Sequence, residues 1–152
     1  MAFNWRTGKK GETEMGFFSS LLGLGGNKKS NIKAEINIMD AINAHIKWKI
    51  RLESYLNGTS EEKLDPNIVC RDDQCVLGKW IHGPALKHFQ NDDGFTTLRD
   101  DHAKFHVVAG KVVSNVQANN KAAAEALMKT EYMLASRKVV SDLTELSKQI
   151  LN

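Results

Sequence analysis

The sequence predicts an all-α fold, a four-helix antiparallel bundle with a metal site in its core. Apolar residues recur three and four positions apart over long stretches, which is the period of an amphipathic helix. No stretch alternates apolar and polar residues as a half-buried strand would. The 152 residues contain only two prolines, so most of the chain is free to be helical. Four such helices joined by short connections bury their apolar faces as a bundle.

Residues 1–30 differ in composition from the rest of the chain. They are rich in glycine, lysine and serine and have no sustained period, so we predict a flexible N-terminal tail followed by one domain over residues 31–152. Met15 is a candidate second start, which would make the preceding residues an upstream extension or an expression remnant. The apolar run GFFSSLLGLGG is too short for a transmembrane helix, and we expect no stable membrane insertion.

The charge and the cysteine content exclude two classes of protein. The net charge of +3 is too small to indicate nucleic-acid binding, and much of it lies near the N-terminus. Two cysteines do not make a disulfide framework, and no secretory signal is evident. We therefore expect a reducing, cytoplasmic location, where a cysteine is free, reactive or metal-bound.

The first helix is predicted from Asn31 to Tyr55. Asn57 and Gly58 follow it, as is usual where a helix ends. Residues 59–74 read as a loop with a short helical turn. The positions that step along one face of the first helix are Ile38, Ile42, His45, Lys49, Leu52 and Leu56.

The second helix is predicted to begin near Cys75. Asp72 or Asp73 would cap its N-terminus by accepting backbone N–H groups. Gly83 and Pro84 then break or kink the helix before the run ALKHF continues it.

Two longer helices are predicted to complete the bundle. The third starts near Thr96 or Thr97 and ends at about Gln117, and an Asn-Asn turn follows. The fourth runs over about 121–150 and carries apolar residues at helical spacing.

Candidate metal ligands lie in three of these segments. His102 and His106 are four residues apart in the run DDHAKFH, so a helix places both imidazoles on one face. Cys75 opens the run CVLGKW, and His45 lies within the apolar stripe of the first helix in the run AHIKW. Three imidazoles and one thiolate form a complete tetrahedral set for Zn²⁺. The four residues would make a zinc site in the bundle core if they converge.

The neighbouring side chains have simpler predicted roles. Trp48 and Trp80 are expected in the core, and Gly78 would let a neighbouring helix approach closely. The remaining two histidines, His82 and His88, are expected at the surface.

Taken in order, the three runs resemble the bacterial chemoreceptor zinc-binding (CZB) domain family. The family pattern is a His followed three residues on by an aromatic residue, then Cys-x-Leu-Gly-x-Trp, then His-x-x-x-His, and the resemblance covers roughly residues 31–145. It implies a four-helix fold that holds zinc through His45, Cys75, His102 and His106. Cys70 matches no ligand position.

The resemblance also implies a role in signal transduction and chemotaxis. The chain has no room for a chemoreceptor signalling region or a cyclic-dinucleotide synthase, so a stand-alone zinc-binding regulatory module is expected. Protonation or oxidation of Cys75 would remove the only charged ligand. The Cys75–zinc pair is therefore a predicted switch for zinc level or for oxidants such as hypochlorous acid. The expected partners are a second copy, paired through the long first and fourth helices, and a signalling protein.

Three other interpretations compete with the sensor. A permanent structural zinc in a protein-interaction module needs the same ligands. A metal-dependent hydrolase needs an open zinc position and a general base, and no HExxH glutamate is present. A di-iron bundle needs inward carboxylates paired with histidines, a spacing that Glu53, Asp100 and Asp101 do not provide. We therefore expect that the protein is not an enzyme.

Overall fold

The computed structural model describes residues 38–151, which are helical and contain no strand. The predicted tail and the predicted helix start at Asn31 lie outside these described residues. The helices are α3 (Ile38–Leu56), α4 (Pro66–Val69), the 3-10 turn η2 (Asp72–Gln74), α5 (Val76–His82), α6 (Pro84–Phe89), α7 (Asp93–Gln117), α8 (Lys121–Lys129) and α9 (Glu131–Leu151).

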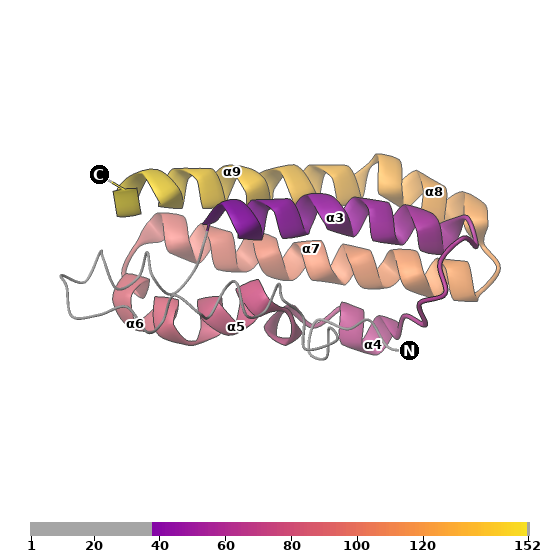
Figure 1. Ribbon diagram of the computed structural model, residues 1–152, viewed down its shortest axis with the longest axis horizontal. Coiled ribbons are helices and arrows are strands. Elements are labelled where there is room, and N and C mark those ends of the chain that lie inside the picture. The colour runs from indigo at the N-terminus through magenta and orange to yellow at the C-terminus, as the bar shows by residue number, and fades with distance from the viewer. Residues whose placement is uncertain (1–37, 152) are drawn as a thin grey trace.

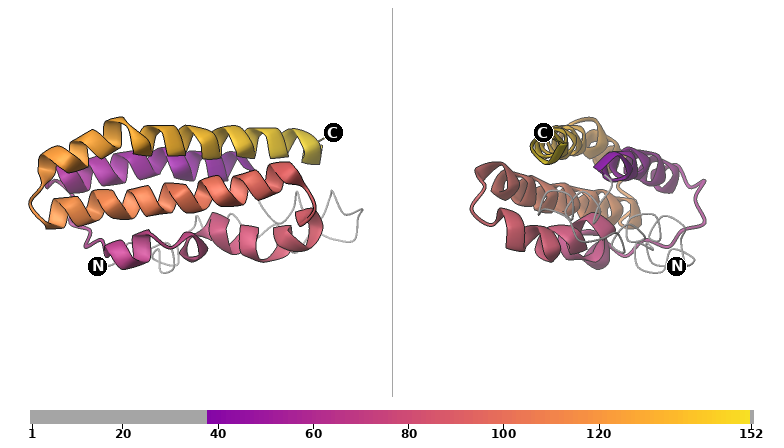
Figure 2. Two further views of the ribbon diagram at one scale, coloured as in Figure 1. Left: turned by 180° about the vertical axis from the view of Figure 1, so that it is seen from behind. Right: turned by 60° about the vertical axis from the view of Figure 1, so that its left-hand side comes forward.

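The chain passes up and down one long axis (Figure 1). The helices α3 and α7 run in one direction, and α8 with α9 runs back along them. In place of the predicted second helix, the chain forms a row of short helices, α4, η2, α5 and α6. This row lies below α7 in Figure 1 and also in the view from behind in Figure 2. The predicted all-α antiparallel bundle is confirmed, with its second member divided into short pieces.

The central helix of the bundle is α7, which packs against α3, α4, α8 and α9. It begins at Asp93, earlier than the predicted start near Thr96 or Thr97. The reason is the preceding residue, because the Asp92 carboxylate accepts a hydrogen bond from the Phe95 N–H at 2.7 Å. Such a cap satisfies a backbone donor that the first helical turn leaves without a partner.

The predicted fourth helix is interrupted at Thr130, which separates α8 from α9. The Thr130 hydroxyl donates to the Ala126 carbonyl at 2.7 Å, and its backbone N–H donates to Leu127 instead of continuing the regular helical pattern. Side-chain hydrogen bonds of this kind bend helices. The break bends the chain near one end of the bundle, and both α8 and α9 remain part of the bundle.

The core is built around large aromatic side chains. Trp48 and Trp80 are 0% and 1% exposed, which confirms their predicted core roles. Phe95, Phe105 and Tyr132 are also fully buried, and aliphatic residues of α7 and α9 fill the space between them. Burial of each such side chain contributes roughly 1.5–3 kcal/mol to folding.

The outer face of α3 exposes three large apolar side chains. Met39, Ile46 and Ile50 are between 55% and 62% exposed and follow one another at helical spacing. Within residues 38–151, no helix has both the length and the hydropathy needed to cross a bilayer.

Candidate metal centre

The four predicted ligands come from three elements of the bundle and are all buried. His45 projects from α3, Cys75 lies between η2 and α5, and His102 and His106 occupy successive turns of α7. Their exposed fractions are 1%, 2%, 0% and 1%, respectively. Polar groups buried this deeply need partners, because burial without one costs free energy.

Three of the four ligands form a compact cluster. Cys75 Sγ and one ring nitrogen each from His102 and His106 lie within 4.8 Å of one another. The Cys75 Sγ to His102 Nε2 distance is 3.4 Å. Zinc–ligand bonds of about 2.3 Å to sulfur and about 2.0 Å to nitrogen at a tetrahedral angle would separate the two atoms by about 3.5 Å. The distance between Cys75 Sγ and His102 Nε2 is therefore close to that expected for two ligands of one zinc ion.

His106 is oriented by a backbone group. Its Nδ1 donates to the Val69 carbonyl oxygen at 2.8 Å, since that oxygen can only accept. The neutral ring then carries a lone pair on Nε2, and this buried nitrogen has no hydrogen-bond partner. Metal-bound histidines are held in this way by a hydrogen bond on the other ring nitrogen.

The carbonyl of Val69 reaches α7 because of a glycine. Gly110 lies one turn beyond His106 and is buried against α4, where an added Cβ would stand 2.8 Å from the Cβ of Cys70. A larger residue would push α4 away from α7. No sequence pattern indicated this packing, because neither a backbone acceptor nor a glycine contact has a residue pattern of its own.

His45 lies beside the cluster without entering it. Its ring centroid is 5.6 Å from that of His102 and 4.7 Å from that of Phe105. Its Nδ1 is buried without a hydrogen-bond partner, as is Nδ1 of His102. His45 is therefore the adjacent imidazole from which a fourth ligand can come.

The turn that carries Cys75 differs from the predicted one. The N-cap of α5 is Cys75 itself, whose Sγ accepts from the Gly78 N–H at 3.2 Å, so the prediction of Asp72 or Asp73 as the cap is wrong. Gly78 does allow a close approach, but by the turn and not by a neighbouring helix. An added Cβ there would collide with the Asp72 carbonyl oxygen. The glycine thus lets η2 fold tightly onto α5 beside the sulfur.

Burial keeps the cluster uncharged when no metal is bound. It raises the pKa of the Cys75 thiol to about 12, against the opposite influence of the Gly78 N–H. Burial also lowers the pKa of His45 to about 3, with His106 adding to the shift, and lowers the pKa of His106 to about 4. The pKa of His102 is lowered well below its ordinary value for the same reason. Neutral imidazoles are the metal-binding form, whereas the thiol must release its proton on binding.

The remaining histidines stay outside the site, as predicted. His82 and His88 are exposed. His82 pairs with the Asp72 carboxylate, with 2.6 Å between Nε2 and Oδ2. Asp101, next to His102, faces Lys104 and Lys138 at 3.4 and 4.0 Å, so it belongs to a separate charged group.

The fold and this cluster define a helical bundle with a buried Cys/His metal site. Residues 45–113 match the family model of the chemoreceptor zinc-binding domain. This segment begins at His45 and contains the other three predicted ligands, so the match confirms the predicted resemblance to this family. No curated protein and no solved structure matches the chain.

Proposed function

We propose that this protein is a zinc-binding regulatory module that holds one zinc ion through His45, Cys75, His102 and His106. The observation that carries the proposal is the buried cluster of Cys75, His102 and His106, in which the unpaired Nε2 of His106 is oriented by the Val69 carbonyl. His45 is proposed as the fourth ligand because it is the adjacent buried imidazole.

The four side chains would join three separate segments of the bundle. Zinc supplies, when bound, a doubly positive centre that holds a thiolate and neutral imidazoles together. Cys75 is the ligand that ties the η2–α5 turn to α7, and it is the one ligand that carries charge. Its loss would release this turn while the histidines of α7 stay in place.

Cys75 is also the ligand that oxidants can alter. In the proposed step the thiolate sulfur takes up the oxygen of hypochlorous acid, chloride leaves, and a sulfenic acid forms. The added oxygen would crowd the sulfur of Cys75, a residue that is 2% exposed and whose Sγ accepts a hydrogen bond from the Gly78 N–H. We propose that the η2–α5 turn then shifts against α7 and that a signalling partner responds to this change.

The two cysteines provide an internal control for this switch. Cys70 is half-buried at the end of α4, and its Sγ contacts the Asn67 carbonyl at 3.4 Å. Mass spectrometry of briefly oxidised, zinc-loaded protein should find the first oxygen on Cys75, accompanied by weaker zinc binding. After zinc removal Cys70 should be oxidised before Cys75, because Cys75 is then a buried thiol. Cys75→Ser should weaken zinc binding, and Cys70→Ser should not.

A permanent structural zinc remains the competing function, since four protein ligands are typical of closed structural sites. It predicts that oxidation of Cys75 leaves zinc affinity and helix packing unchanged. This result would remove the sensor proposal while leaving the zinc site intact. The same closed ligand set leaves no position for substrate or water, so we propose no catalytic role. We also propose that the protein acts in the cytoplasm.

We further propose that the domain spans residues 31–152 and forms a homodimer. The segment beyond the family match is part of the bundle, because α9 packs against both α3 and α7. Met39 and Ile50 expose apolar surface on α3 that suits pairing with a second copy. Light scattering at micromolar concentration should give the dimer mass and Ile50→Glu the monomer mass. A monomer mass for the unmodified protein would contradict the pairing.

A further inference from the structure

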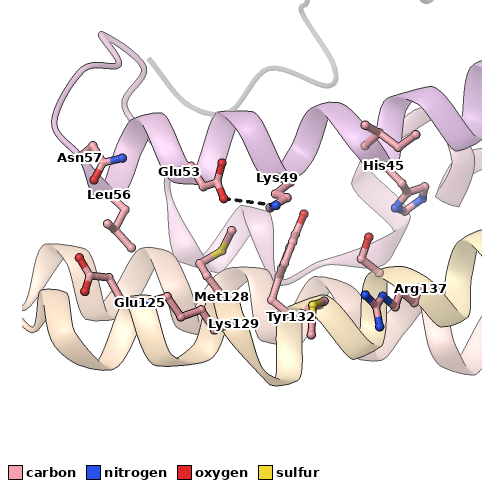
Figure 3. A pocket seen from close by; sticks show the side chains of 13 residues that line it. His45, Lys49, Glu53, Leu56, Asn57, Glu125, Met128, Lys129, Tyr132 and Arg137 are labelled. Atoms are coloured by element: carbon pink, nitrogen blue, oxygen red, sulfur yellow. Dashed lines mark ion pairs between the residues drawn. The ribbon is translucent and has the colours of Figure 1, made fainter.

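A groove separates α3 from α8 and α9 and extends at one end to His45, beside the metal centre. Its volume is about 710 Å³, within the range of roughly 300–1,000 Å³ that is usual for small-molecule sites. His45 lines the groove at the end where Arg137 lies, as Figure 3 shows. One side chain therefore belongs to both the groove and the surroundings of the cluster.

The groove contains a buried donor without a partner. Tyr132 is 1% exposed, and its hydroxyl makes no hydrogen bond within the described part of the chain. In Figure 3 the Tyr132 side chain points from α9 toward α3 across the groove. Burial, with a contribution from Glu53, raises the pKa of Tyr132, so its hydroxyl remains a donor. A buried hydroxyl without a partner costs free energy, which a bound acceptor would offset.

The charges that line the groove favour an anion. Glu53 is paired with Lys49 at 3.6 Å, and Glu125 with Lys121 at 3.9 Å. The groove cations Arg137 and Lys129, in contrast, form no ion pair within residues 38–151. The guanidinium of Arg137 presents a planar set of donors that matches a carboxylate or sulfonate.

Apolar side chains line the space between these polar groups. Ile46 projects from α3, while Met128 and Met133 come from α8 and α9. Ile46 and Met133 are 55% and 39% exposed, so the groove leaves apolar surface open to solvent. Methionine side chains adapt their shape to varied apolar ligands.

We propose that this groove binds a small organic anion with an apolar body. Arg137 holds the anionic group, the Tyr132 hydroxyl donates a hydrogen bond to it, and the apolar body covers Ile46, Met128 and Met133. Because His45 lines the groove, the bound anion lies next to the proposed fourth zinc ligand. The site itself does not depend on zinc, since none of the groups that hold the anion is a proposed ligand.

Binding can be tested with 4-phenylbutyrate and its cationic counterpart 4-phenylbutylamine. Both are titrated into the full-length protein, zinc-loaded and chelator-treated, while the methyl signals of the methionines are followed by NMR. The carboxylate should shift Met128 and Met133 with saturation and leave Met39 unchanged, and the amine should bind several-fold more weakly. Arg137→Gln and Tyr132→Phe should each weaken carboxylate binding about three- to tenfold. Lys148→Gln removes an exposed cation of α9 outside the groove and should have no effect.

Three results would overturn the proposal. They are the absence of saturable shifts in both forms of the protein, equal affinity for the carboxylate and the amine, and unchanged binding in Arg137→Gln with the fold intact by circular dichroism. Zinc content is measured separately in each sample. A protein that lacks zinc but binds the carboxylate would contradict the proposed function and support the groove.

Discussion

The Nδ1 of His106 donates a hydrogen bond of 2.8 Å to the carbonyl oxygen of Val69, 37 residues away in the chain. This bond joins α4 to α7 and leaves Nε2 as the free nitrogen of an imidazole that clusters with Cys75 and His102. It exists because Gly110 lets α4 lie against α7. The orientation of one proposed ligand thus depends on a glycine that touches no metal.

Replacement of this glycine should therefore weaken zinc binding. In Gly110→Ala the added Cβ meets Cys70 and displaces α4, so His106 loses its orienting partner. We expect zinc affinity to fall roughly 10- to 100-fold, as for other second-sphere changes. Competition with a chromophoric chelator measures the affinity, and Val107→Ala, an exposed change on the same helix, is the control. Unchanged affinity in Gly110→Ala would show that the Val69 contact does not hold His106.

A second prediction concerns the turn at Cys75. Gly78→Ala should destabilise the protein by about 1–3 kcal/mol, because the new methyl group overlaps the Asp72 carbonyl oxygen. Zinc affinity should fall as well, since the displaced turn carries the sulfur. Urea unfolding with and without zinc tests both effects, and the exposed neighbour Lys79→Ala should behave like the unmodified protein. A Gly78→Ala protein of full stability would contradict the close packing of η2 on α5.

The third prediction links zinc to folding. A ligand that binds only the folded state adds about 2.7 kcal/mol to the free energy of unfolding when its free concentration is 100 times its dissociation constant. A chelator should therefore lower the melting temperature of the unmodified protein. His102→Ala should be less stable than the unmodified protein in zinc and respond little to chelator, whereas His88→Ala, at an exposed position, should respond fully. An identical chelator response in the two variants would exclude His102 as a ligand.

The fourth prediction concerns Asp142 and Asp101, a carboxyl pair that is not part of the cluster. Burial and the nearby Asp101 raise the pKa of Asp142 from 3.8 to about 6. The folded protein holds this proton more tightly than the unfolded chain, so its contribution to stability is full below about pH 4 and is lost as the pH rises through about 6. Asp142→Asn should therefore gain stability relative to the unmodified protein at pH 7.5 but not at pH 4.

The expected gain is at most about 1 kcal/mol, because Asp142 is partly exposed and solvent screens its charge. Urea unfolding at the two pH values measures it. Asp100→Asn, an exposed change on α7, should show no comparable difference between the two pH values. A gain in Asp142→Asn that is the same at both pH values would exclude the shifted proton as its cause.

The helical period predicted the bundle because each long helix has one apolar face. Local chemistry decided where the helices end, and it was harder to foresee. Asp92 starts α7 early, and Thr130 interrupts the last helix. Both effects depend on single side-chain hydrogen bonds that compete with neighbouring residues of similar type. The observed helix boundaries therefore differ from the predicted ones by several residues, whereas the order of the helices agrees with the prediction.

The spacing of the candidate ligands predicted their shared burial, and the cluster of Cys75, His102 and His106 agrees with it. The i and i+4 positions of the two α7 histidines follow from helix geometry. The partner of His106 is a backbone carbonyl, and such an acceptor is present at every residue. No sequence pattern could therefore single out Val69. The position of His45 beside the cluster depends on how α3 packs, which helical spacing alone does not determine.

The zinc ligand set is tested most directly by X-ray absorption at the zinc edge of the purified protein. We expect about one zinc per chain with one sulfur ligand at about 2.3 Å and three nitrogen ligands at about 2.0 Å. Cys75→Ser should remove the sulfur from this shell, and His45→Ala should remove one nitrogen. A shell of oxygen atoms alone, or two sulfur atoms that would require Cys70, would contradict the proposed site.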